Sequence, residues 1–359
     1  MKFLTTFLLS ACLATQVLAQ GNSANANGNG NGNGNGNGKD KDTDPEEFTF
    51  TVEATFQGKK IPQNEIKLKK IPPGQEASPG KKLGLEKKEN NNNRRSTDES
   101  EMITARATTT PPKNPTSGSA NWCGSVRYAT TTNQIKLIHA YFQHPTCTKR
   151  TGQTYPQAAA QWAGIDGDTW PGAVLQSGTV CKFDNATATV RYVPTLLTNP
   201  LKHHPNHPFP SSTYLTNPTK KTKNRNEAWW QWLPSGAYTI SSLPVAAGDW
   251  FELTINTTSN RAAKIVLANV SKGYAYTITV SGGAALGRLD ADWVVERPSY
   301  GSGLSGFPKF SDVWFQKAYA TLDKGSGASL GITGATQLQI PNLCASAGYD
   351  NENLVAWSL

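Results

Sequence analysis

The feature that most constrains the fold is a succession of short β-type segments that fills the chain after Trp122. Each segment is rich in β-branched and aromatic residues and is bounded by Gly, Asn or Pro, and none shows the 3.6-residue apolar stripe of a helix. The pattern predicts an antiparallel all-β sandwich with few helices. The predicted strands lie within residues 126–143, 172–180, 188–193, 250–258, 264–270, 274–282, 290–298, 312–322 and 336–340.

Tryptophan and cysteine mark the extent of the folded unit. All ten tryptophans of the 359-residue chain, and four of its five cysteines, lie at or after Trp122. We therefore expect the folded domain at 113–359, a size that suits one β-sandwich. Residues 196–226 interrupt the strand pattern with a Pro-rich, basic stretch, which predicts a long exposed loop inserted into this domain.

The beginning of the sequence predicts export. Residues 1–19 combine a basic start, a short apolar run and small residues before a cleavage point, as in a secretory signal peptide. That run is too short to cross a membrane and no later one follows, so we expect a secreted, soluble, monomeric protein. Three sequons, at Asn185, Asn256 and Asn269, are candidate glycan sites. Two disulfides are expected, in any of three pairings of Cys123, Cys147, Cys181 and Cys344.

Residues 20–112 have the layout of a pro-peptide. An Asn-Gly repeat over 27–38 cannot form a core. A basic module follows at 48–95; it opens with an alternating, strand-like stretch at 48–57 and ends at the dibasic pair Arg94-Arg95. We expect this segment to be removed on maturation. We also expect this basic segment to cover and block a carboxylate-bearing cleft of the folded domain through charge attraction, which acid would weaken.

Several functions are disfavoured by the residues themselves. The net charge of +9 is dispersed along the chain, so nucleic acid is not an expected partner. No metal or other cofactor is expected, because the histidines at 203, 204 and 207 lack nearby ligands to complete a site. Asp292 and Glu296 share a strand face about 13 Å apart. Glycosidase pairs usually stand about 5 to 9.5 Å apart, so these two would need another partner such as Glu227.

Three ordered segments carry a more specific signal. They are QWAGIDGDT with AVLQSG within residues 161–178, EAWWQWLP at 227–234, and ADWVVE at 291–296. Together with the Ser-Ala-Asn-Trp stretch at 119–122, they resemble the glutamic peptidases, or eqolisins, which are secreted acid endopeptidases. The resemblance covers residues 119–320 and implies a lectin-like β-sandwich with a substrate cleft on its concave face.

The resemblance implies a catalytic pair formed by Gln176 and Glu296, acting on protein or peptide substrates. An ionised Glu296 can take a proton from water and pass it to the leaving amine. The amide N–H of Gln176 can stabilise the oxyanion. We expect the substrate-binding cleft to be lined by Trp162, Asp166, Glu227, Trp229 and Gln231.

The sequence also departs from that family. Gln231 and Asp292 stand where Glu is usual, and Leu233 and Trp170 replace residues that are often Tyr and Cys. These changes leave the pair intact but bear on substrate preference and pH optimum. The alternative function is a non-catalytic or glycan-binding lectin-like sandwich that has kept the scaffold.

Overall fold

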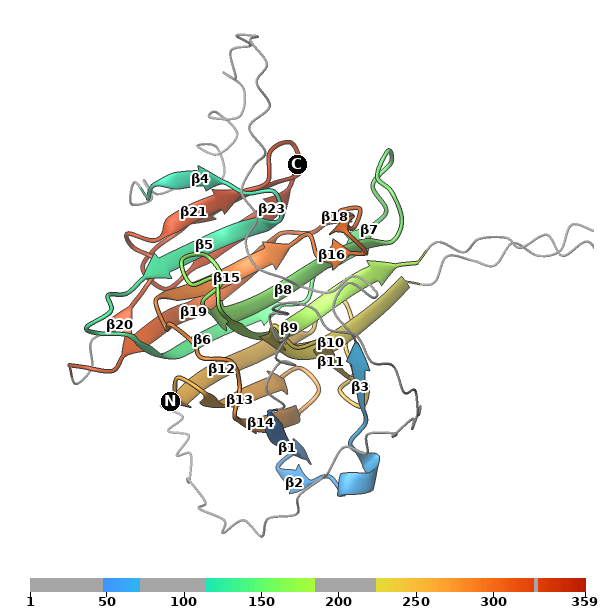
Figure 1. The fold of residues 1–359 in the computed structure, drawn as a ribbon. Coiled ribbons are helices and arrows are strands. Elements are labelled where there is room, and N and C mark those ends of the chain that lie inside the picture. The colour runs from blue at the N-terminus through green and yellow to red at the C-terminus, as the bar shows by residue number, and fades with distance from the viewer. Residues whose placement is uncertain (1–47, 72–113, 185–223, 326–328) are drawn as a thin grey trace, which may run out of the picture.

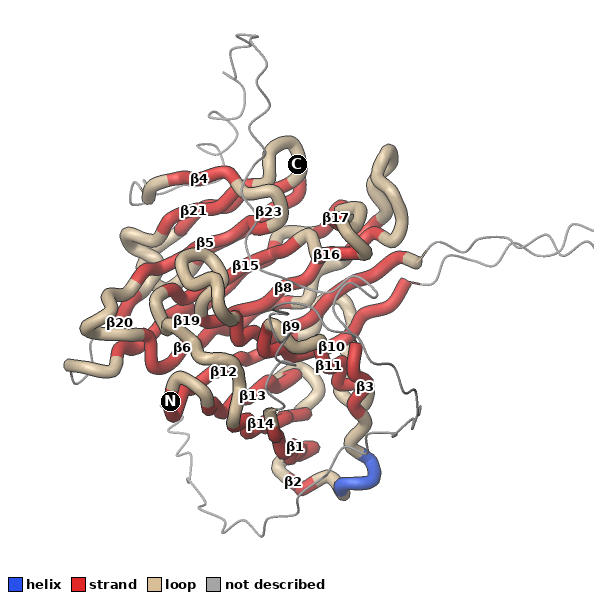
Figure 2. The backbone as a smooth tube through the Cα atoms, viewed as in Figure 1, coloured by secondary structure: helices blue, strands red, loops and turns tan. Residues whose placement is uncertain are grey.

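The computed structural model describes residues 48–71, 114–184, 224–325 and 329–359. Within these ranges two large β-sheets form a sandwich, and the sole helical element is a 3₁₀ turn, η1 (Gln63–Glu65) (Figures 1 and 2). The all-β fold predicted from the sequence is confirmed. The same ranges contain no helix with the length and apolar character needed to cross a membrane.

The first sheet, sheet A, has the strand order β2-β1-β14-β13-β12-β6-β19-β23-β22, with β20 paired to β19. Neighbouring strands in it run antiparallel. Its strands are β1 (Thr49–Phe56), β2 (Lys59–Lys60), β6 (Ile135–Gln143), β12 (Trp250–Ser259), β13 (Ala262–Asn269), β14 (Tyr274–Ser281), β19 (Val313–Leu322), β20 (Ser329–Leu330), β22 (Cys344–Gly348) and β23 (Leu354–Ser358).

The second sheet, sheet B, has the order β3-β11-β10-β9-β8-β15-β5-β21-β4 and is antiparallel except between β21 and β4. Its strands are β3 (Leu68–Ile71), β4 (Thr116–Gly118), β5 (Trp122–Tyr128), β8 (Gln157–Ile165), β9 (Val174–Phe183), β10 (Asn224–Leu233), β11 (Ala237–Ile240), β15 (Asp290–Glu296) and β21 (Thr336–Gln339). Two small sheets pair β16 (Ser299–Tyr300) with β17 (Gly303–Leu304), and β7 (Cys147–Thr148) with β18 (Lys309–Phe310).

Sheet B is buried on both of its faces. On the inner face, Ala291, Trp293 and Val295 of β15 join the core that the two sheets share. On the outer face, a second apolar cluster includes Trp122 and Trp162. As a result β8, β9 and β15 are buried along their whole length.

Some element predictions need correction. The strand predicted over 126–143 is two strands, β5 and β6, because the chain turns between Thr130 and Asn133. The sequence did not predict β8, β10, β11, β22 or β23. The loop predicted over 196–226 overlaps β10, which begins at Asn224. The rest of that loop lies outside the described residues, as do the strand predicted over 188–193, the expected signal peptide, the Asn-Gly repeat and the dibasic pair.

Of the three disulfide pairings left open by the sequence, the structure has Cys123–Cys344 and Cys147–Cys181. One candidate glycan site is excluded by burial. Asn269 is fully buried, and its amide donates to the Pro244 carbonyl at 2.8 Å and to Asp249 Oδ2 at 2.9 Å. An N-linked glycan would have to break both hydrogen bonds and leave the protein interior.

Candidate active site

The predicted catalytic residues lie on one face of sheet B. Gln176 is on β9 and Glu296 on β15, with Trp162 on the intervening strand β8. The register pairs Trp162 with Gly178 of β9 and with Val294 of β15. Because side chains alternate along a strand, the even-numbered residues of these three strands share the outer face.

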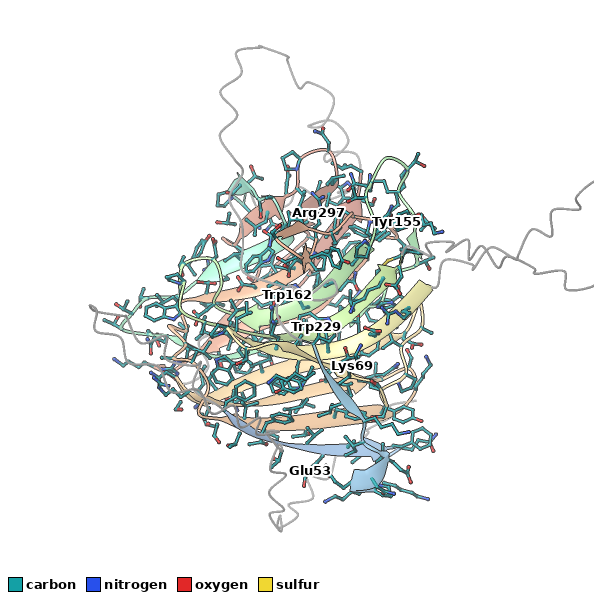
Figure 3. The ribbon with its side chains drawn as sticks, turned by 45° about the vertical axis from the view of Figure 1, so that its right-hand side comes forward. Glu53, Lys69, Tyr155, Trp162, Trp229 and Arg297 are labelled. Atoms are coloured by element: carbon teal, nitrogen blue, oxygen red, sulfur yellow. A yellow bond between two sulfur atoms is a disulfide. The ribbon has the colours of Figure 1, made fainter. Side chains whose placement is uncertain are left out.

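The aromatic strand β10 contributes its odd-numbered residues to the same face, since Trp229 pairs with Gly178. Trp229 is 2% exposed and Gln231 is 1% exposed. Figure 3 shows Trp162 and Trp229 over the central strands of this sheet. Four of the predicted cleft and catalytic side chains, those at 162, 176, 229 and 231, therefore surround one patch of sheet B.

Glu296 is fully buried, and each carboxylate oxygen accepts a hydrogen bond. Trp162 Nε1 donates to Oε2 at 2.9 Å, and Asn121 Nδ2 donates to Oε1 at 3.3 Å. Asn121 is itself held at the start of β5, where Ser119 Oγ donates to its Oδ1 at 3.3 Å. Two N–H donors of this kind fix the orientation of the carboxyl group.

Gln176 is also fully buried and is oriented by Gln231. Gln176 Nε2 donates to Gln231 Oε1 at 3.2 Å, and Gln231 Nε2 donates to the Ser235 carbonyl at 3.1 Å. The Ser235 carbonyl can only accept, so it requires Gln231 to present its oxygen to Gln176. Gln176 must then turn its NH₂ group toward Gln231, which leaves one of the two N–H bonds for another acceptor.

The catalytic candidates are offset along the sheet. Gln176 pairs with Gly164, which in turn pairs with Asp292, whereas Glu296 pairs with Ala160. The two backbones are thus two strand spacings apart, about 10 Å, and four residues apart along the strands, about 13 Å. A partnership between the two side chains therefore needs a substrate lying between them, above Trp162.

Glycine makes room for Trp162 in this patch. A Cβ added at Gly178 would lie 2.0 Å from the Gln161 carbonyl oxygen and 2.8 Å from Trp162 Cβ. A Cβ at Gly164 would lie 3.0 Å from both Gln176 Cβ and the Trp162 ring. The two glycines flank the indole and let it lie close to the backbone of β9.

Asp166 lies at the end of β8 and holds a loop together. It has a positive φ of 67°, and it accepts hydrogen bonds from the backbone N–H of Leu289 at 2.8 Å and of Arg288 at 2.9 Å. Burial and the nearby carboxylate of Asp290 raise its pKa to about 7. These contacts give the predicted cleft residue Asp166 a structural role beside the site.

Asp292 and Asp290 extend this group of buried carboxyls. Burial, followed by the charges of Asp290, Asp168 and Asp166, raises the pKa of Asp292 well above its usual range. Burial also raises the pKa of Asp290, which accepts hydrogen bonds from the backbone N–H groups of Asp168 and Thr169. Neither carboxyl oxygen of Asp292 has a hydrogen-bond partner among the described residues, so burial favours the protonated form of this side chain.

Glu227 lies farther along β10 and belongs to an ion-pair network. Its Oε2 is 3.0 Å from Lys182 Nζ, and its Oε1 is 3.4 Å from Arg225 Nη1. The side chain of Lys182 is only 4% exposed, so Glu227 neutralises a buried charge. The ion pairs with Lys182 and Arg225 are sufficient to explain a carboxylate at position 227, without a role in substrate binding.

Sequence reasoning missed Asn121 and Ser235, the two residues that complete the orientation of Glu296 and Gln176. Asn121 lay within the Ser-Ala-Asn-Trp stretch that carried the resemblance, but nothing in the sequence aligned it with Glu296. The register does so, because Trp122 of β5 pairs with Glu296 of β15. Within the described ranges, no three His, Cys, Asp or Glu side chains are arranged to hold a metal ion, and the three loop histidines lie outside those ranges.

The chain is similar in sequence to a known protein family, and the match includes the segments that carry the candidate site. The model of the Peptidase A4 family matches residues 120–203 and 214–356, together more than half of the chain. Aspergillopepsin-2 of Aspergillus niger is 28% identical over 195 residues, which cover 54% of this chain and 54% of that protein. The chain thus spans about half the length of this curated relative.

The fold of the chain is also similar to several solved structures. Scytalido-glutamic peptidase with a transition-state analog inhibitor is 19% identical and covers 67% of this chain and 98% of its own, with a TM-score of 0.49. SCP-B, an eqolisin in complex with the tripeptide Ala-Ile-His, is 20% identical with the same coverage and a TM-score of 0.46. Aspergilloglutamic peptidase from Aspergillus niger is 23% identical and covers 56% of this chain and 99% of its own, with a TM-score of 0.42.

Proposed function

The chain belongs to the Peptidase A4 family, and on that premise we propose that it is a glutamic-type endopeptidase that hydrolyses protein or peptide substrates. The observation that carries the proposal is the placement of Glu296 and Gln176 on one buried face, each oriented by hydrogen bonds of its own. A carboxylate and an amide arranged in this way supply a base and an oxyanion donor.

Glu296 acts as the general base and then as the general acid. It takes a proton from a water molecule, whose oxygen bonds to the carbonyl carbon of the scissile peptide. The protonated Glu296 then gives its proton to the amine nitrogen as the C–N bond breaks, which restores the carboxylate. Trp162 and Asn121 keep the carboxylate pointed at the substrate throughout.

Gln176 stabilises the negative charge that develops on the carbonyl oxygen. The N–H bond not used by Gln231 donates to this oxyanion, and loss of one such donor typically costs about 2.7–4 kcal/mol of transition-state stabilisation. Gln231 contributes by holding the amide in its donating orientation. Position 231 is where the resemblance implies a glutamate. Gln231 still presents a hydrogen-bond acceptor, its Oε1, to Gln176.

The proposal includes action in acid and secretion. An amide does not titrate near pH 4, so only Glu296, with a reference pKa of about 4.3, must be partly ionised. Export through residues 1–19 and cleavage that separates residues 20–112 from the rest of the chain are part of the same proposal. The layout of the sequence before residue 113 supports them.

The proposed activity is tested with acid-treated protein and a denatured protein substrate, followed by mass spectrometry of the fragments. We expect Glu296→Gln to lower kcat by about 10²- to 10⁴-fold. We expect Gln176→Ala to lower it by about 10²- to 10³-fold.

Asp292→Asn is the matched control, because it makes the same carboxyl-to-amide change on the same strand. Burial raises the pKa of Asp292 well above its usual range, so the fold favours an uncharged side chain there, and this variant should keep most of its activity. If Asp292→Asn abolished cleavage and Glu296→Gln spared it, the assignment of the base would be wrong. Absence of cleavage together with binding to a glycan array would support the alternative lectin-like function.

A further inference from the structure

The N-terminal segment 48–71 adds one strand to the edge of each large sheet. Its first strand, β1, pairs antiparallel with β14 over eight residues, from Thr49 opposite Ser281 to Phe56 opposite Tyr274. Its last strand, β3, pairs with β11 over four residues. Figure 1 shows β1, β2 and β3 in blue together at the end of the sandwich opposite β4. The segment therefore bridges the two sheets at one open side.

Apolar side chains of this segment complete the shared core. Val52 and Ala54 of β1 are 6% and 1% exposed and belong to the main core cluster. Phe50 lies edge-on to Trp230 at 5.1 Å and to Tyr238 at 4.9 Å between ring centroids. Partly buried side chains add to this contact: Phe48, Ile61, Ile66 and Leu68.

Residues 48–71 contact the rest of the protein mainly through apolar side chains and main-chain hydrogen bonds. Outside the strand pairs, Gln57 N donates to the Gly273 carbonyl at 2.7 Å, and Ser241 N donates to the Lys67 carbonyl at 2.8 Å. Lys60 pairs with Glu53 inside the segment itself, so that ion pair adds nothing to docking. Main-chain pairing and apolar contact therefore hold the segment in addition to any charge attraction from its lysines.

The segment also lies outside the family domain. The family match begins at residue 120, whereas β14 and β11 fall within it. Without the segment, β14 and β11 would each be an edge strand with unpaired main-chain groups, and Trp230 and Tyr238 would lose their aromatic cover. Open edges of this kind bind extended peptides by strand addition, in which main-chain hydrogen bonds give affinity and alternate side chains give specificity.

We propose that residues 48–71 are a separable β-clamp, docked on the paired edges of β14 and β11, that stays bound after the chain is cut between residues 71 and 114. The partner that fits this surface is the protein's own N-terminal segment, held as a second polypeptide. Its hold depends on strand pairing and on Phe50, and salt does not weaken it. The clamp does not rest on the proposed catalytic function.

The test uses the full chain with a specific protease site in place of residues 91–95, in a Glu296→Gln background that prevents self-cleavage. After cutting is verified under denaturing conditions, the product is run on a gel-filtration column at low salt and at 1 M NaCl, where the Debye length is about 3 Å. We expect both fragments to elute together at both salt concentrations. Separation at low salt would overturn the clamp, and separation only at high salt would show charge-driven docking instead.

Two variants on the same strand sharpen the result. Phe50→Asp removes the contact with Trp230 and Tyr238, and it should increase the released fraction by about tenfold or more. Thr51→Asp puts the same charge on the exposed face of β1 and should leave retention unchanged. Circular dichroism of the uncut variants checks that both are folded before cutting. Equal retention of the two folded variants would contradict the proposal.

Discussion

The side chain at position 231 determines how the Gln176 amide is oriented and whether that orientation depends on pH. It connects the Ser235 carbonyl to Gln176 and so decides which end of the Gln176 amide faces the substrate. A glutamate at 231 could do the same only while protonated, because an ionised carboxylate would face the Ser235 carbonyl oxygen without a donor. The amide keeps its donor at every working pH.

Substitutions at 231 test this orienting role. Gln231→Leu should lower kcat about five- to tenfold with little change in KM, because one orienting hydrogen bond is lost. Gln231→Glu should match the wild type well below the glutamate reference pKa of about 4.3 and lose activity as pH rises past it. Steady-state pH–rate profiles of both variants measure this. An unchanged kcat in Gln231→Leu would show that Gln176 needs no such support.

At the residue scale, the sequence could locate the candidate pair but not what surrounds it. Gln176, Glu296, Trp162, Trp229 and Gln231 were predicted from their ordered segments, and the structure places them on one face. Their hydrogen-bond partners come from other strands through register, which no local pattern encodes. Asp166 was likewise predicted from its segment, and its carboxylate accepts hydrogen bonds from the backbone N–H groups of Arg288 and Leu289, which the segment alone could not predict.

Among the elements, the strands of sheet A were the easier to predict. Those with one face toward solvent, such as β12 (burial alternating along Trp250–Ser259), show the period of two that sequence reasoning depends on. β8 carries alanines on both of its faces and is buried throughout, so its sequence has no polar alternation to detect. Of the four strands that hold the candidate site, β9 and β15 were predicted from the sequence, whereas β8 and β10 were not.

The packing of β8 against β9 depends on Gly178. We expect Gly178→Ala to destabilise the fold by about 3 kcal/mol or more, because the new methyl group would overlap the Gln161 carbonyl and the Trp162 side chain. Gly303→Ala is the control, since nothing lies within 4 Å of a Cβ there. Urea unfolding of the two variants measures the difference. Equal stabilities would mean that β8 can move away from β9.

At the scale of the whole molecule, the buried carboxyl groups make the free energy of unfolding depend on pH. The folded-state pKa values of Asp166, Asp290 and Asp292 are raised, so the fold favours their protonated forms. Their contribution to stability is fully present below the unfolded-state pKa of about 3.9 and is lost as pH rises through the folded-state values. For Asp166 this loss falls between about pH 4 and about pH 7.

The melting temperature should therefore fall as pH is raised from 4 to 8, and the loss from these carboxyls together should be on the order of a few kcal/mol. Asp292→Asn should flatten this decline, because an amide needs no proton to remain buried. Calorimetry across the pH range, at constant ionic strength, compares the variant with the wild type. Parallel curves for the two proteins would exclude Asp292 as a source of the pH dependence.

The position of the candidate site within sheet B also determines which strands can accept substitutions as the protein evolves. Gln176, Trp162 and Glu296 lie on β9, β8 and β15, each hydrogen-bonded to a strand on either side. β10 and β11 are also paired on both sides, but they lie nearer the edge of the sheet. Descendants with new substrate preferences should therefore accumulate changes on β10 and β11 first, and Gln231 of β10 already departs from the glutamic-peptidase pattern that the sequence resembles.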